Sequence, residues 1–278
     1  MITADQHVHS HHSGDSEARM EEIAEQAAAR GMTDLCFTEH EDLDYPDVGD
    51  PEITRETFLL DADAYYREYC GVRDRFADRI RLQFGLELGL QPHIAEENRQ
   101  FVKAHPYDLV IASTHVSGRR DPYYPAFYEG RSEEDAIREV LTETFDNIRA
   151  FDDFDVVGHL DYVVRYLPSR RESVDMTPFA ELIDEILKLL IRRDQGLDLN
   201  TAPMWKKGRP EMNPSRQILR RYRELGGRLI TFGSDAHHAE HVAGAFDQAE
   251  KIAAECGFTE YCVYRKRKPE MRKMTVFS

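Results

Sequence analysis

The sequence predicts an α/β fold with a mostly parallel β-sheet, either open or closed into a barrel. The first observation behind this prediction is that short apolar segments alternate with longer amphipathic ones along the 278 residues, as in successive strand–helix units. The second is that no repeat, low-complexity segment or linker interrupts this alternation, so we expect one domain spanning residues 1–278. The third is that almost every predicted strand is followed directly by a polar or metal-ligating residue.

Each strand–helix unit follows from its own pattern. Apolar segments bounded by turn residues predict strands at residues 2–8, 34–38, 80–86, 107–113, 154–158, 196–200, 228–232 and 260–264. Amphipathic segments predict helices at 16–30, 57–76, 94–104, 133–151, 178–193, 214–225 and 240–256. In the first helix, Ser16 is expected to be the N-cap and Gly31 the stop. The loops 41–52 and 117–130 are expected to flank a site, the second as a lid or pocket wall.

Composition limits the classes of partner. The formal net charge of −16 argues against binding to a nucleic-acid polymer or an anionic membrane. We expect neither a signal peptide nor a membrane span, because no apolar run is long enough. The four scattered cysteines indicate reduced thiols in a cytoplasmic protein. The basic run 265–268 is expected to be a solvated edge or tail, and the oligomeric state stays open.

The polar residues that follow the strands form the main functional signal. In chain order, these strand ends carry His7 and His9, Glu39 and His40, Glu87, His115, His159 and Asp161, Asn200, and Asp235 and His237. The carboxyl ends of parallel strands open onto one face, so these side chains are expected to converge there. His7 and His9 are two residues apart, so both imidazoles point to the same side of an extended strand.

This ligand set predicts a metal centre. It consists of imidazoles and carboxylates without cysteine, which favours Zn, Mn or Fe over a sulfur-bound structural ion. It also contains more donors than one ion can hold, so we expect two or three divalent ions. No GxSxG or Walker-type loop supports another mechanism. Such a centre suits hydrolysis of a phosphate ester, because it activates water and neutralises charge as phosphorus is attacked.

The motifs HVHSHHSGD, TEH, ELG, STH, GHLD and GSDAH occur in this order and resemble those of the PHP (polymerase and histidinol phosphatase) family, in particular its stand-alone bacterial histidinol-phosphatases. The resemblance extends over nearly the whole chain. It implies a distorted, TIM-like (βα)7 barrel. It also implies a phosphomonoesterase that converts L-histidinol phosphate to L-histidinol and phosphate in histidine biosynthesis, by attack of a metal-bound hydroxide.

The resemblance also implies three metal sites. The first would contain His7, His9, Glu87 and Asp235, and the second would contain Glu87 as a bridge with His115 and His159; Asp15, His40 and His237 would form the third. Glu87, Asp235 and His237 are therefore the residues predicted to be catalytic. The other histidines near the site, at positions 11, 12, 238 and 241, are expected to support the ligands or face solvent.

Two cations are predicted to bind the substrate phosphate. Arg165 matches a phosphate-binding arginine of the resembling enzymes, and a guanidinium can hold two phosphate oxygens. A second family arginine would follow Asn200, but this chain has Trp205, Lys206 and Lys207 in that region, and Lys206 is the candidate. This departure keeps a nucleotide or another small phosphate ester open as the substrate. A metal-binding PHP module without catalysis is a further alternative.

Overall fold

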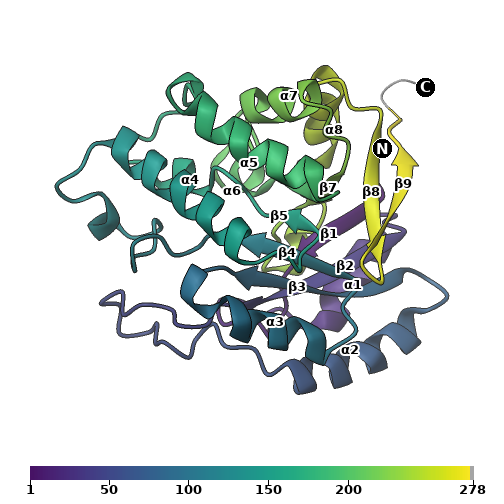
Figure 1. The fold of residues 1–278 in the computed structure, drawn as a ribbon. Helices are drawn as coiled ribbons and strands as arrows, with labels where there is room; N and C mark the ends of the chain where they lie inside the picture. The colour runs from purple at the N-terminus through teal and green to yellow at the C-terminus, as the bar shows by residue number, and fades with distance from the viewer. Residues whose placement is uncertain (276–278) are drawn as a thin grey trace.

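The structure, a computed structural model, describes residues 1–275 and is a nearly closed barrel of parallel strands with helices around it (Figure 1). Seven strands pair in sequence order: β1 (Ala4–Val8), β2 (Asp34–Glu41), β3 (Arg81–Gly89), β4 (Leu109–Ser113), β5 (Val156–Val157), β6 (Gly196–Asn200) and β7 (Ile230–Gly233). Almost every residue of these strands is buried, as expected where helices cover the outer face and side chains fill the interior. The predicted α/β barrel is therefore confirmed.

The helices lie between successive strands. They are α1 (Met20–Ala29), α2 (Ala62–Phe76), α3 (Ala95–Ala104), α4 (Glu133–Ala150), α5 (Ala180–Arg192), α6 (Ala202–Lys207), α7 (Arg216–Glu224) and α8 (Phe246–Glu255). Short 3₁₀ turns occur at Pro92–Ile94, Pro125–Tyr128, Tyr162–Tyr166, Thr177–Phe179 and Ala239–His241. Within the described part of the chain, no helix is long and apolar enough to cross a membrane.

The barrel closes between the ends of its first and last parallel strands. The backbone N–H of His9 donates to the carbonyl of Ala236 at 2.9 Å, and the N–H of Asp235 donates to the carbonyl of His7 at 2.8 Å. These bonds join residues more than 220 positions apart in the sequence. They also place the two histidines of β1 beside the carboxylate that follows β7.

A C-terminal hairpin contacts the amino end of the barrel. Strands β8 (Glu260–Arg265) and β9 (Lys268–Lys273) pair antiparallel and run along one side of the barrel (Figure 1). Cys262 and Tyr264 of this hairpin form a small buried cluster with side chains from β2, β4 and β5. The backbone N–H of Tyr264 donates to the side chain of Gln6 in β1 at 2.8 Å.

The expectation that the basic run 265–268 is a solvated edge or tail holds for its two exposed lysines but not for its two arginines. Arg265 lies 3.2 Å from Asp34, a buried carboxylate at the start of β2. Arg267 contacts the carboxylate of Asp155, and the backbone N–H of Lys266 donates to Asp108 at 2.8 Å. The charges of the two arginines therefore pair with aspartates at the amino ends of the strands, which composition alone does not reveal.

Three predicted helix starts are corrected. Helix α1 begins at Met20, because the Ser16 hydroxyl donates to the carbonyls of His9 and His237 instead of capping the helix. Helix α2 begins at Ala62, five residues later than expected, where the side chain of Asp61 accepts from a free backbone N–H. Helix α8 begins at Phe246, because the left-handed backbone of the two alanines at 243 and 245 interrupts any helix that starts at 240.

Candidate metal centre

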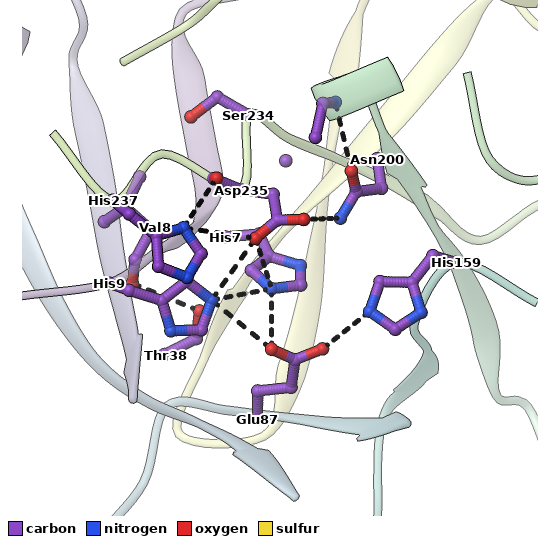
Figure 2. Close-up of polar contacts among 12 residues, drawn as sticks. His7, Val8, His9, Thr38, Glu87, His159, Asn200, Ser234, Asp235 and His237 are labelled. Atoms are coloured by element: carbon purple, nitrogen blue, oxygen red, sulfur yellow. Dashed lines mark hydrogen bonds and ion pairs between the residues drawn. The ribbon is translucent and has the colours of Figure 1, made fainter. Parts of the chain in front are cut away.

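The carboxyl end of the barrel brings together the nine side chains predicted as metal ligands, several of which are seen in Figure 2. They come from β1 and the loop after it, from β2 and β3, and from the residues that follow β4, β5 and β7. These nine are His7, His9, Asp15, His40, Glu87, His115, His159, Asp235 and His237. Six imidazoles and three carboxylates thus face one another at the mouth of the barrel.

The first group of donors is the most deeply buried. His7 Nε2 lies 3.1 Å from His9 Nε2 and 3.0 Å from Glu87 Oε2. His9 Nε2 is 3.3 Å from the same Glu87 oxygen and 3.6 Å from Asp235 Oδ1. Two ligands of a tetrahedral zinc ion with bonds of about 2.0–2.1 Å lie about 3.3 Å apart. The observed spacing therefore matches that of atoms sharing one ion.

Hydrogen bonds behind the ligands fix which nitrogens point inward. His7 Nδ1 is 2.9 Å from Asp198 Oδ2, so this nitrogen carries the donated hydrogen. The hydroxyl of Ser13 donates to Glu39 at 2.6 Å and therefore accepts from His9 Nδ1 at 3.0 Å. When both imidazoles are neutral, the lone pairs of their Nε2 atoms face the Glu87 carboxylate. Lone pairs and a negative charge repel one another, and a cation bound between them removes this repulsion.

The second group is arranged around the other oxygen of the same glutamate. Glu87 Oε1 lies 2.9 Å from His159 Nε2 and 3.2 Å from His115 Nε2, and it accepts from the Ser113 hydroxyl at 2.6 Å. His115 Nδ1 is held by Asp42 at 2.9 Å. Glu87 therefore joins the first and second groups, as expected of a bridging carboxylate.

The third group lies nearest to solvent. His237 Nε2 is 3.0 Å from Asp15 Oδ2, and His40 Nε2 is 3.7 Å from Asp15 Oδ1. His237 Nδ1 donates to the backbone carbonyl of Asp235 at 3.0 Å, which turns Nε2 towards Asp15. The ring of His9 stacks on those of His40 and His237, with centroids 4.2 and 4.4 Å apart, so this group adjoins the first.

Burial and charge shift the pKa values of these groups. Burial alone would raise the pKa of Glu87, but neighbouring imidazoles, chiefly that of His7, hold it well below its usual range. Burial lowers the pKa of His159 to about 4, so this imidazole is neutral near pH 7. Burial would also lower the pKa of His7, but Glu87 and Asp198 raise it well above its ordinary value. A proton on His7 thus balances carboxylates that a metal cation would otherwise neutralise.

This donor set fits divalent metal ions. Imidazole and carboxylate ligands without thiolate suit first-row divalent ions. The buried His159 Nδ1 has no hydrogen-bond partner among the described residues, whereas its Nε2 points at Glu87. Ions bound there would act as Lewis acids towards a phosphoryl group and lower the pKa of bound water.

A pocket of about 310 Å³ opens directly onto the donors. Its walls include the predicted loops, through Tyr45, Asp50, Asp121, Tyr123 and Tyr124, together with Tyr162 and Tyr166. The expectation that residues 117–130 form a pocket wall is thus confirmed. Arg119 of this loop instead forms an exposed ion pair with Asp44, 3.5 Å away.

Arg165 enters the pocket from the 3₁₀ turn after β5. Its Nη1 donates to Asp235 Oδ2 at 3.1 Å and its Nε donates to Asn213 Oδ1 at 2.6 Å. Its Nη2 is buried and has no hydrogen-bond partner in the described residues. A buried donor without a partner is costly, so this nitrogen is suited to an oxygen of a bound anion.

Lys206 also lines the pocket, and its positive charge helps to hold the pKa of Asp235 below its usual range, although burial opposes this. Trp205 does not line the pocket. Its indole N–H donates to the carbonyl of Ser234 at 2.8 Å, and its ring stacks on that of His241 at 4.2 Å. Of the three residues named from the sequence in this region, only Lys206 therefore lines the pocket.

Other candidate residues lie away from the donors. Asp161, one of the polar residues expected to converge at the strand ends, accepts from the side chain of Asn213 and from the backbone N–H of Ser215 and does not line the pocket. His11 and His12 contact Glu68 on the outer side of the loop after β1. The remaining histidines at 93, 105, 238 and 241 also lie outside the pocket lining.

Sequence reasoning missed the residues that orient the ligands and the acidic group in the pocket wall. Asp42 lies two residues after His40, and Asp198 lies inside β6, where alternation points it towards His7. The even spacing of Asp198 and Asn200 along the strand is a signal that could have identified the former. Asp121, held by the Tyr45 hydroxyl at 2.5 Å, has no comparable local signal.

Comparison with known proteins agrees with this geometry. The sequence pattern of the PHP domain matches residues 5–202, which is well over half of the chain. The chain belongs to the PHP domain family. A histidinol-phosphatase of Lactococcus lactis is 32% identical over 277 residues, covering 99% of both chains. A probable histidinol-phosphatase of Clostridium acetobutylicum is 29% identical over 253 residues, covering 91% of this chain and 93% of the relative.

A solved structure supports the same family on the level of the fold. The crystal structure of histidinol phosphate phosphatase from Lactococcus lactis, complexed with Zn, L-histidinol and phosphate, superposes with a TM-score of 0.87. It is 31% identical and covers 96% of this PHP chain and 98% of that chain. The distorted barrel of this PHP protein is therefore shared with a zinc-containing phosphatase structure.

Proposed function

We propose that this chain is a metal-dependent phosphomonoesterase that hydrolyses L-histidinol phosphate to L-histidinol and phosphate. The observation that carries the proposal is a single pocket that joins clustered imidazole and carboxylate donors to the partnerless Nη2 of Arg165. Donors for divalent ions and a free guanidinium nitrogen together suit a phosphate group. The full-length similarity to a histidinol-phosphatase supports the choice of substrate.

We assign the nine donors to two or three divalent ions. His7, His9, Glu87 and Asp235 would hold one, and Glu87 would extend to a second with His115 and His159. Asp15, His40 and His237 would hold a third. The distances of 2.9–3.3 Å between the imidazole nitrogens and the Glu87 oxygens support the first two assignments. The donors of the third site are farther apart, with 3.7 Å between His40 Nε2 and Asp15 Oδ1.

The protein's own groups position the phosphate. Arg165 would bind phosphate oxygens through Nη2, while its Nη1 keeps Asp235 turned towards the donors. Lys206 would supply a second positive charge from the same pocket. Glu87, Asp235 and His237 all line the pocket, so we assign the catalytic role to these three. Asn200 donates to Asp235 at 3.1 Å and helps to fix its carboxylate.

The rest of the pocket suits the organic part of this substrate. L-Histidinol carries an amine and an imidazole, and the pocket wall offers five tyrosines and several carboxylates, among them Asp121. Tyrosine faces and a carboxylate attract a cationic group that is partly withdrawn from water. Asp121 accepts from the Tyr45 hydroxyl through Oδ2 at 2.5 Å and from the backbone N–H of Tyr123 through Oδ1 at 2.7 Å, so its carboxylate has a defined position.

We further propose that residues 1–278 act as one phosphoesterase domain, and that it works in the cytoplasm. The described residues share one main core that contains side chains from β1 through to the C-terminal hairpin. All four cysteines are free, and three of them are buried, which suits a reducing compartment.

The deciding experiment is phosphate release by protein reconstituted with Zn, Mn or Fe. The substrates are L-histidinol phosphate, a nucleoside monophosphate, a sugar phosphate and an aryl phosphate. We expect kcat/KM for L-histidinol phosphate to exceed the others by several orders of magnitude, whereas equal and poor rates on all four would contradict the assigned substrate. An Asp121→Asn variant should lose activity on L-histidinol phosphate but keep its rate on the aryl phosphate, which has no amine.

A further inference from the structure

Three metal-ligating side chains also meet outside the pocket, on the outer side of the loop after β1. His11 and His12 belong to this loop, and Glu68 lies on α2. The Nε2 atoms of His11 and His12 lie 3.3 and 3.1 Å from the same oxygen, Glu68 Oε2. The two rings are 4.5 Å apart between centroids. This trio contains none of the nine side chains of the metal centre.

The trio is held by structure around it. The backbone N–H of His11 donates to the carbonyl of Ala18 at 2.8 Å, and the N–H of Ser13 donates to the carbonyl of Ser10 at 2.9 Å. The Ser10 hydroxyl donates in turn to the buried Glu39 at 2.6 Å. The loop conformation that presents both histidines is therefore fixed from inside, so little ordering would be required when a ligand binds.

The geometry matches that of a metal site. Ligands of one tetrahedral zinc ion lie about 3.3 Å apart, and the two nitrogen–oxygen distances here are 3.3 and 3.1 Å. Among the described residues, no Lys or Arg forms an ion pair with Glu68, so two imidazoles are its only charged partners. Two imidazoles and a carboxylate form a donor set preferred by zinc and its first-row neighbours.

We propose that His11, His12 and Glu68 form an additional site for a divalent first-row metal ion such as Zn²⁺, separate from the metal centre. The side chains of His11 and Glu68 are 39% and 37% exposed, so water completes the coordination. Three ligands at the surface bind more weakly than the buried groups of the centre. A metal ion bound at this site would link the loop that carries His9 and Asp15 to helix α2.

Zinc titration of the metal-loaded protein tests this site without reference to turnover. Calorimetry of the wild type should show one weak equivalent of Zn²⁺ beyond the ions of the centre. The double variant His11→Ala/His12→Ala should lose this equivalent, and Glu68→Gln should weaken it by at least about tenfold. The control His93→Ala removes an exposed histidine paired with Asp44 elsewhere and should leave it unchanged.

Equal stoichiometry and affinity in all four proteins would overturn the proposal. Glu68→Gln removes a charge from an exposed position, so it keeps the test valid even where the double variant folds poorly. In crystals grown with Zn²⁺, we also expect an anomalous peak about 2.1 Å from both Nε2 atoms, and its absence would again overturn the site. Because ions are counted rather than turnover, this result is independent of the proposed phosphatase activity.

Discussion

The two ends of the barrel both contain buried carboxylates, but they pair with different partners. At the amino end, Asp34 lies 2.7 Å from Arg272, and Asp155 contacts Arg267 of the C-terminal hairpin. At the carboxyl end, Glu87 faces imidazoles instead, with His7 Nε2 only 3.0 Å away, and Asp235 is shared between imidazoles and Arg165. Guanidinium groups are permanent cations, whereas imidazoles are neutral or protonated and can bind metal ions.

This difference suggests that the amino end of the barrel contributes to stability and the carboxyl end to metal binding. The carboxylates of the amino end are neutralised by arginines and, among the described residues, have no imidazole beside them, so we expect the amino end to contribute to stability. A carboxylate surrounded by imidazole lone pairs is suited to a metal cation, so the carboxyl end acts in binding and catalysis. Changes at the carboxyl end should therefore affect turnover most, and changes at the amino end should affect unfolding alone.

The largest effect is expected for Glu87→Gln. Loss of the charge that faces His7, His115 and His159 should lower kcat/KM for L-histidinol phosphate by about 10³-fold, or about 4 kcal/mol of transition-state stabilisation. Steady-state phosphate release measures the loss of kcat/KM, and the metal content of the purified variant measures the loss of bound ions. The matched variant at the amino end, Asp155→Asn, should retain kcat/KM per folded molecule. Full activity in a folded Glu87→Gln protein would contradict the division between the two ends.

Removal of metal ions by a chelator should have the next largest effect. Ions that bind only the folded protein contribute about 4 kcal/mol when present at a thousandfold excess over Kd, which corresponds to a fall in Tm of about 10 °C on stripping. Calorimetric unfolding with and without chelator gives the shift. Glu87→Gln should show a smaller shift than the wild type, and an equal shift in both would argue against Glu87 as a ligand.

A smaller effect is expected for Asp42→Ala, which removes the carboxylate behind His115 rather than a ligand. Partners of this kind typically alter metal affinity or activity by about 10–100-fold. Metal titration and kcat/KM should both report the loss, and Asp42→Asn should restore part of it because its amide oxygen still accepts from His115 Nδ1. Wild-type metal affinity in Asp42→Ala would show that His115 needs no such support.

The smallest effect is expected for Arg267→Ala at the amino end. The buried Asp155 would lose its cation, and since Arg267 is 24% exposed, we expect a loss of about 1–2 kcal/mol in the free energy of unfolding. Urea denaturation measures it, with the surface pair variant Arg73→Ala as a control near zero. Turnover per folded molecule should stay at the wild-type level, and a fall in kcat/KM would mean that the two ends are coupled.

Much of the centre was predictable because most of its ligands lie in the last residues of the strands or directly after them. In a parallel barrel, all strands end at the same face. His7, His159 and Asp235 therefore converge there, whatever the lengths of the helices between them. The residues that were missed depend on contacts between distant segments. Asp42 directly follows β2, but its role depends on His115, which is 73 residues away in the sequence, and Asp121 is held at the site by Tyr45 of another loop.

By itself, the sequence determined the alternation of strands and helices and the donor chemistry at the strand ends, because periodicity and residue type are local properties. The tertiary structure decided which charges are neutralised and by which partner. It paired the two arginines of the basic C-terminal run with buried aspartates and used Ser16 to join two loops rather than to cap a helix. It also left one nitrogen of Arg165 without a partner among the described residues. These outcomes depend on pairings between residues far apart in the chain, which no local pattern specifies.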